Sequence, residues 1–163
     1  EALAEVLPFP NKVAVVYMTG AQLLETLEAA SQGLPYTAET ADACASLMQV
    51  SGLTYTVDTA KAYDALEAYG DHWFTAGSVS RVRIDDVNGQ PFDAEATYAV
   101  VTSNANFNGM DSSYVLKAAA EANEQSAVTT AVVRDVVFRF IAAELNHQVG
   151  EVYAAPQGRL TIL

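Results

Sequence analysis

The sequence predicts an α+β domain: a mixed β-sheet with an antiparallel meander, flanked by amphipathic helices. Three observations predict this class. An apolar, β-branched run over residues 12–19 passes directly into a segment of helical period over 20–30. Residues 53–57 and 79–84 alternate apolar and polar side chains, as half-buried strands do. Residues 128–149 carry apolar side chains at steps of three and four, the pattern of an amphipathic helix.

The first strand and helix follow a loop that holds Pro8 and Pro10, which have no amide hydrogen to give to a ladder. Because residues 12–19 are almost uninterruptedly apolar, we expect a strand buried on both faces. Thr19 is the expected N-cap of the helix over 20–30, with Gln22 as its capping-box partner.

The helix over 20–30 has two faces of different character. Its leucines share the face that we expect to be buried, namely Leu23, Leu24 and Leu27. Its long polar side chains are expected to face away from the core, namely Gln22, Glu25 and Glu28. An apolar strand that feeds a capped amphipathic helix is a nucleus for an α/β layer.

The next part of the chain is predicted to alternate loops with short elements. Residues 31–40 contain Gly and Pro and are expected to form a loop, and the Ala-rich residues 38–48 a short helix. A turn at 49–52 leads into the strand over 53–57. Residues 58–77 are predicted to be a long surface connection, with helical character over 60–69.

The predicted meander begins with the strand over 79–84. Asn88-Gly89 is the signature of a type I′ turn, which reverses the chain in a hairpin. Residues 90–92 and 97–101 are expected to supply the returning strands.

The C-terminal third is predicted to be mainly helical. A loop rich in Asn, Gly, Asp and Ser covers 104–113, and a short Ala-rich helix covers 114–123. The helix over 128–149 is expected to pack its apolar side on the sheet and to stop at Gly150, and residues 159–163 form a closing strand. With no repeat or linker in sight, we expect residues 1–163 to form a single domain.

Composition excludes several classes of protein. Eight basic against twenty acidic residues give a net charge of −12, which disfavours nucleic acid and anionic membranes as partners. The longest apolar runs are too short for a membrane span, which needs about 20 residues. The chain begins at Glu1 without a leader, so we expect a trimmed piece of a longer protein. Cys44 stands alone, so no disulfide framework is expected and inert burial is its default role.

Several stretches, taken together in order, resemble one known family. The first two are LPFPN at 7–11 and TGAQLLETLE at 19–28, followed by QVSGLTYTVD at 49–58. The others are SRVRIDDVNGQPFDAEATYAVVTSN at 80–104 and YAAPQGRLTIL at 153–163. The series is similar to the C-terminal domain of the bacterial and animal 5′-nucleotidases, and it runs nearly end to end.

The resemblance implies a division of labour between two domains. In that family a preceding metallophosphatase domain holds two divalent metals (Zn or Mn) and hydrolyses phosphate esters of nucleotides. The C-terminal domain grips the nucleoside, with the base stacked between two aromatic rings. For this chain it therefore implies a nucleotide or nucleoside as ligand, no cofactor of its own, and a secreted, periplasmic or cell-surface bacterial parent.

The resemblance also implies where the ligand binds. Tyr114 is the candidate stacking ring and Asp111 its polar partner, with Gly109, Asn104 and Phe107 in the same loop. From the residues alone, other roles stay open. Tyr114 could be the first apolar anchor of its helix, Asp111 an N-cap, and Phe107 cover for the core or a displaced ring.

The sequence departs from the family at this site. Met110 and the pair Ser112-Ser113 stand where the family has glycines, and Leu47 and Met48 stand where the first ring is expected. These changes open an alternative: a degenerate member that acts as a non-catalytic binding or interaction module.

Histidines and aromatic residues elsewhere suggest no second site. His72 and His147 lie far apart in the sequence and have no cysteine or histidine cluster around them, so we predict no metal site. Trp73 and Phe74 could form an aromatic binding patch, although a hydrophobic plug under the long connection explains them more simply.

Overall fold

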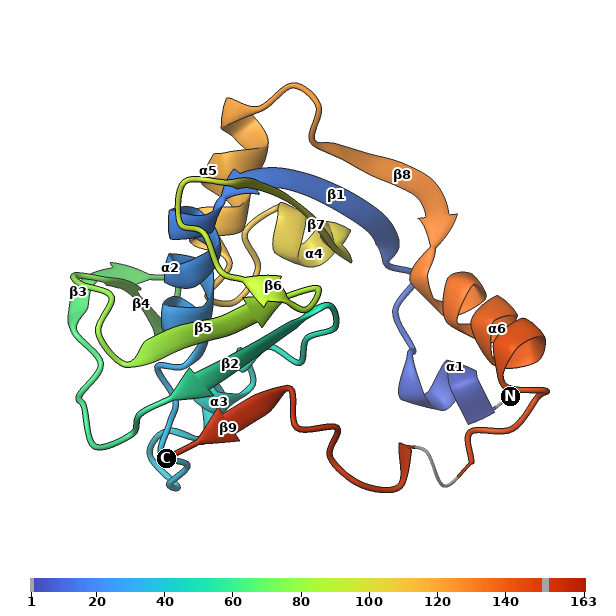
Figure 1. Cartoon of the computed structure of the whole chain (residues 1–163), viewed down its shortest axis with the longest axis horizontal. Coiled ribbons are helices and arrows are strands. Elements are labelled where there is room, and N and C mark those ends of the chain that lie inside the picture. Colours follow the sequence, from blue (N-terminus) through green and yellow to red (C-terminus); the bar gives the residue numbers. More distant parts are fainter. Residues whose placement is uncertain (1, 151–152) are drawn as a thin grey trace.

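The computed structural model describes residues 2–150 and 153–163 and shows two main sheets with a separate hairpin (Figure 1). One sheet has the strand order β7-β1-β8, the second has the order β6-β5-β2-β9, and β3 pairs with β4. The strands are β1 (Lys12–Thr19), β2 (Leu53–Val57), β3 (Ala65–Tyr69), β4 (Trp73–Ala76), β5 (Val82–Val87), β6 (Gln90–Pro91), β7 (Thr97–Ser103), β8 (Ala127–Val132) and β9 (Leu160–Ile162). The helices are α1 (Ala2–Val6), α2 (Gly20–Ala30), α3 (Ala41–Cys44), α4 (Asn104–Phe107), α5 (Tyr114–Ala122) and α6 (Val133–Glu144). The predicted α+β class is confirmed.

Strand β1 is the centre of the first sheet and pairs antiparallel with β7 and β8. Its even-numbered residues Ala14, Val16 and Met18 are buried, but the residues between them are only half-buried. The prediction of a strand buried on both faces is therefore wrong. Helices α2 and α5 contact β1, and only one of its faces is fully covered.

Helix α2 has the predicted limits and the predicted cap. Thr19 accepts a hydrogen bond from the amide of Gln22 at 3.2 Å, and the Gln22 side chain accepts one from the Thr19 amide at 2.9 Å. One prediction for this helix is wrong, because Glu28 is fully buried. Its carboxylate accepts hydrogen bonds from the backbone amides of Arg81 and Val82, so it joins α2 to the start of β5.

The second sheet contains the predicted hairpin. Asn88 and Gly89 have φ of 52° and 73°, as a type I′ turn requires, and β6 pairs antiparallel with β5. Strand β2 pairs antiparallel with β5 and parallel with β9, which confirms the closing strand.

The antiparallel meander ends earlier than predicted, because β7 leaves the second sheet and pairs with β1. The crossing segment is fixed at the start of α2. The amides of Gly20 and Ala21 donate to the carbonyls of Ala96 and Ala94, at 2.9 and 2.8 Å. The first amides of a helix have no partner within the helix, so the crossing segment supplies them with acceptors.

The predicted helical character over 60–69 is also wrong, since β3 pairs with β4 across a turn in which Gly70 has φ of 74°. The Tyr63 hydroxyl donates to the carbonyl of Phe74 at 2.7 Å, and that of Tyr69 donates to Gly109. Tertiary contacts therefore override a weak local helical tendency in this hairpin.

Two more helices are shorter than predicted. Residues 38–48 hold only the four-residue α3, and the loop over 104–113 contains α4. The helix predicted over 128–149 begins at Val133, because the residues before it pair with β1 as β8. No residue of α6 is buried, so the sheet does not cover its apolar side as predicted; α6 contacts α1 and β8, the edge strand that leads into it. Helix α5 confirms the prediction for 114–123.

The core lies between the sheets and under helices α2 and α5. Its buried members include Val16, Leu27, Tyr55, Ile84 and Leu116. None of the described helices is long and apolar enough to cross a membrane.

Candidate ligand-binding cavity

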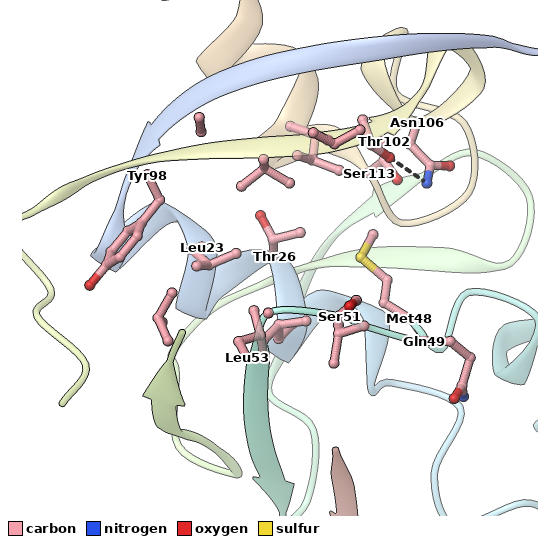
Figure 2. A pocket seen from close by; sticks show the side chains of 18 of the residues that line it. Leu23, Thr26, Met48, Gln49, Ser51, Leu53, Tyr98, Thr102, Asn106 and Ser113 are labelled. Carbon is pink, nitrogen blue, oxygen red and sulfur yellow. Dashed lines mark hydrogen bonds between the residues drawn. The ribbon is translucent and has the colours of Figure 1, made fainter. Parts of the chain in front are cut away.

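A cavity of about 1000 Å³ lies between the two main sheets (Figure 2). This volume is at the upper end of the range for small-molecule sites, about 300–1000 Å³. Its lining comes from α2, from the segment before β2, from β7 and from the Asn104–Tyr114 bend.

Aliphatic side chains form the walls of the cavity. Leu23 and Leu27 face it from α2, Met48 and Leu53 from the segment that enters β2, and Val100 from β7. The spacing explains these positions, because successive residues of a strand face opposite sides and leucines four apart lie on one helix face. We call these five residues the aliphatic walls.

One end of the cavity is polar. Its side chains come from the last part of β7 and from the bend that follows, namely Thr102, Asn106, Asp111 and Ser113. We call this set the polar end. The Asn106 amide nitrogen donates to the Thr102 hydroxyl at 3.2 Å, and Figure 2 shows this bond with Ser113 beside it.

The backbone of the bend holds the polar end in place. Asp111 has φ of 55°, the left-handed region in which Asp and Asn are better tolerated than most side chains. The Met110 amide donates to the carbonyl of Ala105 at 3.0 Å, and the Ser113 amide donates to that of Met110 at 3.1 Å. The loop that replaces the expected glycines is thus a closed turn, and it directs Asp111 and Ser113 to the cavity.

Of the five residues predicted to bind substrate, the structure places Asp111 at the cavity. Asn104 opens α4, and its side-chain oxygen accepts from the Lys12 amide at 2.6 Å. The carbonyl of Gly109 accepts from the Tyr69 hydroxyl at 2.7 Å. Phe107 is half-buried and packs against the core. The cavity lining found here includes neither these three residues nor Tyr114.

Tyr114 connects three elements through its phenol. Its hydroxyl donates to Glu25 of α2 at 2.9 Å and accepts from the Ala76 amide of β4 at 3.0 Å. Its ring packs against Tyr69, with the ring centroids 5.6 Å apart. Burial raises the pKa of Tyr114 to about 12. These contacts match its role as an anchor of helix α5.

The alternative role for Asp111 does not hold. The N-cap of α5 is Ser113, and no side-chain capping bond is made there. Asp111 therefore faces the cavity as the one charged side chain among the lining residues of the described chain.

Sequence reasoning missed Asn106 and Thr102 as lining residues, whereas Met48, which stands where the first ring is expected, does line the cavity. Thr102 could have been found, because it continues the period-two row of Tyr98 and Val100 along β7. Asn106 could not, since only the packing of one sheet over the other brings its side chain to the cavity.

The described residues contain no group of three or more His, Cys, Asp or Glu that could hold a metal ion. Trp73 packs its ring edge-on against His72, and the amide of Phe74 donates to the side chain of Gln32, just after α2. Strand β4 contacts α2, while the Phe74 side chain stays 43% exposed. Cys44 is half-buried, and its thiol donates to the carbonyl of Gly33.

The fold and the cavity define an α+β domain with a ligand-sized hollow between its layers. The family model of the 5′-nucleotidase C-terminal domain matches residues 1–118, which is more than half of the chain. The chain therefore belongs to the 5′-nucleotidase C-terminal domain family, and the predicted resemblance is confirmed.

Solved structures support this assignment. The chain is similar to the 5′-nucleotidase precursor of Thermus thermophilus, with 28% identity and a TM-score of 0.71 over 99% of this chain and 27% of that one. It shares its fold with the NAD nucleotidase of Haemophilus influenzae, at 17% identity and a TM-score of 0.66 over 99% and 26% of the two chains. It also shares its fold with a putative 5′-nucleotidase of Staphylococcus aureus, at 15% identity and a TM-score of 0.58 over 98% and 29%.

The chain thus spans between a quarter and a third of the length of these neighbours. A search of curated proteins found no match to the sequence.

Proposed function

We propose that this chain is the nucleoside- or nucleotide-binding part of a secreted 5′-nucleotidase-like metallophosphoesterase. Family membership supports this proposal, as does the partial coverage of a 5′-nucleotidase precursor that is 28% identical. In the proposed enzyme, a preceding metallophosphatase domain hydrolyses the phosphate ester of a nucleotide. The present domain binds the ligand and orients it for that reaction.

One observation carries the proposal: the Asn104–Tyr114 bend borders a cavity of ligand size. Asp111 offers carboxylate oxygens that accept hydrogen bonds from sugar hydroxyls. Asn106 beside it offers both donors and an acceptor. Polar groups that converge on one end of an apolar hollow are typical of small-molecule sites.

The binding test is a titration of the chain with adenosine and with AMP. Backbone amide shifts of Asn106, Asp111 and Ser113 are followed by NMR, and the amide of Ser78, which lies outside the lining, is the reference. We expect saturable shifts at the three residues with at least one ligand. If neither ligand moves them up to millimolar concentration, the proposed function is wrong.

Metal chemistry is proposed to come from the preceding domain, with Zn²⁺ or Mn²⁺ as its two ions. Among the described residues there is no cluster of ligands for such ions. The chain alone is therefore expected to leave AMP unhydrolysed when Zn²⁺ or Mn²⁺ is added. Phosphate release above that of buffer would overturn this part of the proposal.

A second function, a binding or interaction module without nucleotide recognition, is favoured by the position of Tyr114. Its hydroxyl is bonded to Glu25 and to the Ala76 amide, and the lining of the cavity includes Tyr98 but not Tyr114. A base stacked between two rings therefore has no matching pair in this cavity. The absence of NMR shifts with both adenosine and AMP would support this second function.

A further inference from the structure

The charge of the cavity sets a limit on what can bind in it. Its lining within the described chain contains no Lys, Arg or His, and it contains one carboxylate, that of Asp111. The chain as a whole carries a net charge of −12. A phosphate group inside this cavity would be desolvated without a cation to pair with, and it would face Asp111.

One cation lies next to the cavity without lining it. The guanidinium of Arg159 donates to the carbonyl of Val50, a lining residue, at 3.4 Å. Arg159 itself lines a neighbouring smaller hollow of about 350 Å³. This contact uses one of the five N–H donors of the guanidinium, and Arg159 is not among the residues that line the larger cavity.

We propose that the cavity selects an unphosphorylated nucleoside over the corresponding nucleotide and holds its base between aliphatic walls. This inference rests on the proposed function and adds the chemical class of the preferred ligand. A neutral nucleoside loses no ionic hydration when it enters. Its hydroxyl groups can donate to Asp111, and the Asn106 amide can pair with its polar edges.

The walls suit the flat face of a base even though they are not aromatic. Met48 enters the cavity from the segment before β2, and Thr102 enters from β7 on the opposite side (Figure 2). A thioether makes favourable contacts with aromatic rings, and its flexible chain adapts to their shape. Met48 therefore offers the face of a base a flexible, polarizable contact.

The three methionines of the chain allow a direct test. Met48 lines the cavity, Met18 is 2% exposed in the core, and Met110 is 59% exposed on the surface. With methyl-labelled methionine, NMR titrations with adenosine and AMP report on all three positions in one sample. We expect adenosine to shift the Met48 methyl saturably while the Met110 methyl stays in place.

The expected selectivity is a dissociation constant for AMP at least about tenfold above that for adenosine, which corresponds to about 1.4 kcal/mol. Asp111→Asn removes the negative charge and keeps a side chain that tolerates positive φ. The Asp111→Asn variant should therefore bring the dissociation constant for AMP closer to that for adenosine. Ser51→Trp places a large ring at an exposed lining position and should weaken adenosine binding, whereas Ser78→Trp, exposed and outside the lining, should not.

The outcomes separate this inference from the proposed function. If AMP binds as tightly as adenosine or more tightly, the selectivity is wrong and nucleotide binding stands. If adenosine binds without moving Met48, or if Ser51→Trp has no effect on it, the location is wrong. If neither ligand binds, the proposed function itself fails.

Discussion

Glu28 gives the sharpest test of the packing described here, because it is a carboxylate with no exposed surface. Its oxygens accept hydrogen bonds from the Arg81 amide at 3.1 Å and the Val82 amide at 2.9 Å. Glu28→Ala would leave both amides buried without an acceptor. Each unsatisfied buried donor costs about 1–3 kcal/mol, so the expected loss in free energy of unfolding for the two donors is about 2–6 kcal/mol.

Glu28→Gln keeps the shape of the side chain and one acceptor oxygen. Hydrogen bonds to a charged group contribute about 1.5–3 kcal/mol and neutral ones about 0.5–1.5, so weakening both bonds is expected to cost about 2–3 kcal/mol. Glu121→Ala on α5 is the matched control. The side chain of Glu121 is 69% exposed, and its ion pair with the Lys117 ammonium is long, at 4.0 Å. Because exposed ion pairs contribute little, the expected change in free energy of unfolding is below about 0.5 kcal/mol.

The assay is urea unfolding of the three variants and the parent protein, with hydrogen exchange of the Arg81 and Val82 amides as a local readout. In Glu28→Ala, the exchange rates of the Arg81 and Val82 amides should rise more than those of the other amides of β5. A Glu28→Ala variant as stable as Glu121→Ala would refute the role of the buried carboxylate. If Glu28→Gln lowers the free energy of unfolding as much as Glu28→Ala does, the retained acceptor oxygen of Gln does not stabilise the two amides.

Two further predictions concern Tyr114 and helix α6. Tyr114→Phe should lower the free energy of unfolding by about 1–2 kcal/mol, because its bonds to Glu25 and the Ala76 amide are lost. Burial raises the pKa of Tyr114 to about 12, so the fold favours the neutral phenol. The stability that this contributes is fully present below the unfolded pKa of about 10 and is lost as the pH rises toward 12. Urea midpoints at about pH 9 and pH 11 should therefore differ less in Tyr114→Phe than in the parent protein, and an equal difference would contradict this. Phe138→Ser on α6 should change stability by less than about 0.5 kcal/mol, because Phe138 is 59% exposed. Leu27→Ala, at a position 1% exposed, should cost about 2–5 kcal/mol in the same thermal or urea assay. Similar losses in these two variants would show that α6 is packed after all.

The local elements that could be predicted are those whose signal is contained in neighbouring residues. Thr19 and Gln22 form the expected capping box, and Asn88-Gly89 forms the expected turn. Residues 65–69 are the opposite case. Their helical tendency is weak, and pairing with β4 decided their conformation.

The candidate site was only partly accessible to sequence reasoning. The resemblance led to the Asn104–Tyr114 bend, and Asp111 of that bend does line the cavity. Tyr114 lies in the same stretch, but its phenol is bonded to α2 and β4, which are remote in sequence. Where its ring lies therefore depends on how α5 sits on those elements.

By itself, the sequence determined the α+β class, the family, the capped strand–helix unit at 12–30 and the Asn-Gly hairpin, because periodicity, caps and turns act over a few residues. Only the tertiary structure decided that β7 joins β1, that Glu28 is buried under β5 and that α6 has no buried face. The cavity belongs to this second group. It is the space between two sheets, and its size and its charge depend on which side chains those sheets bring face to face.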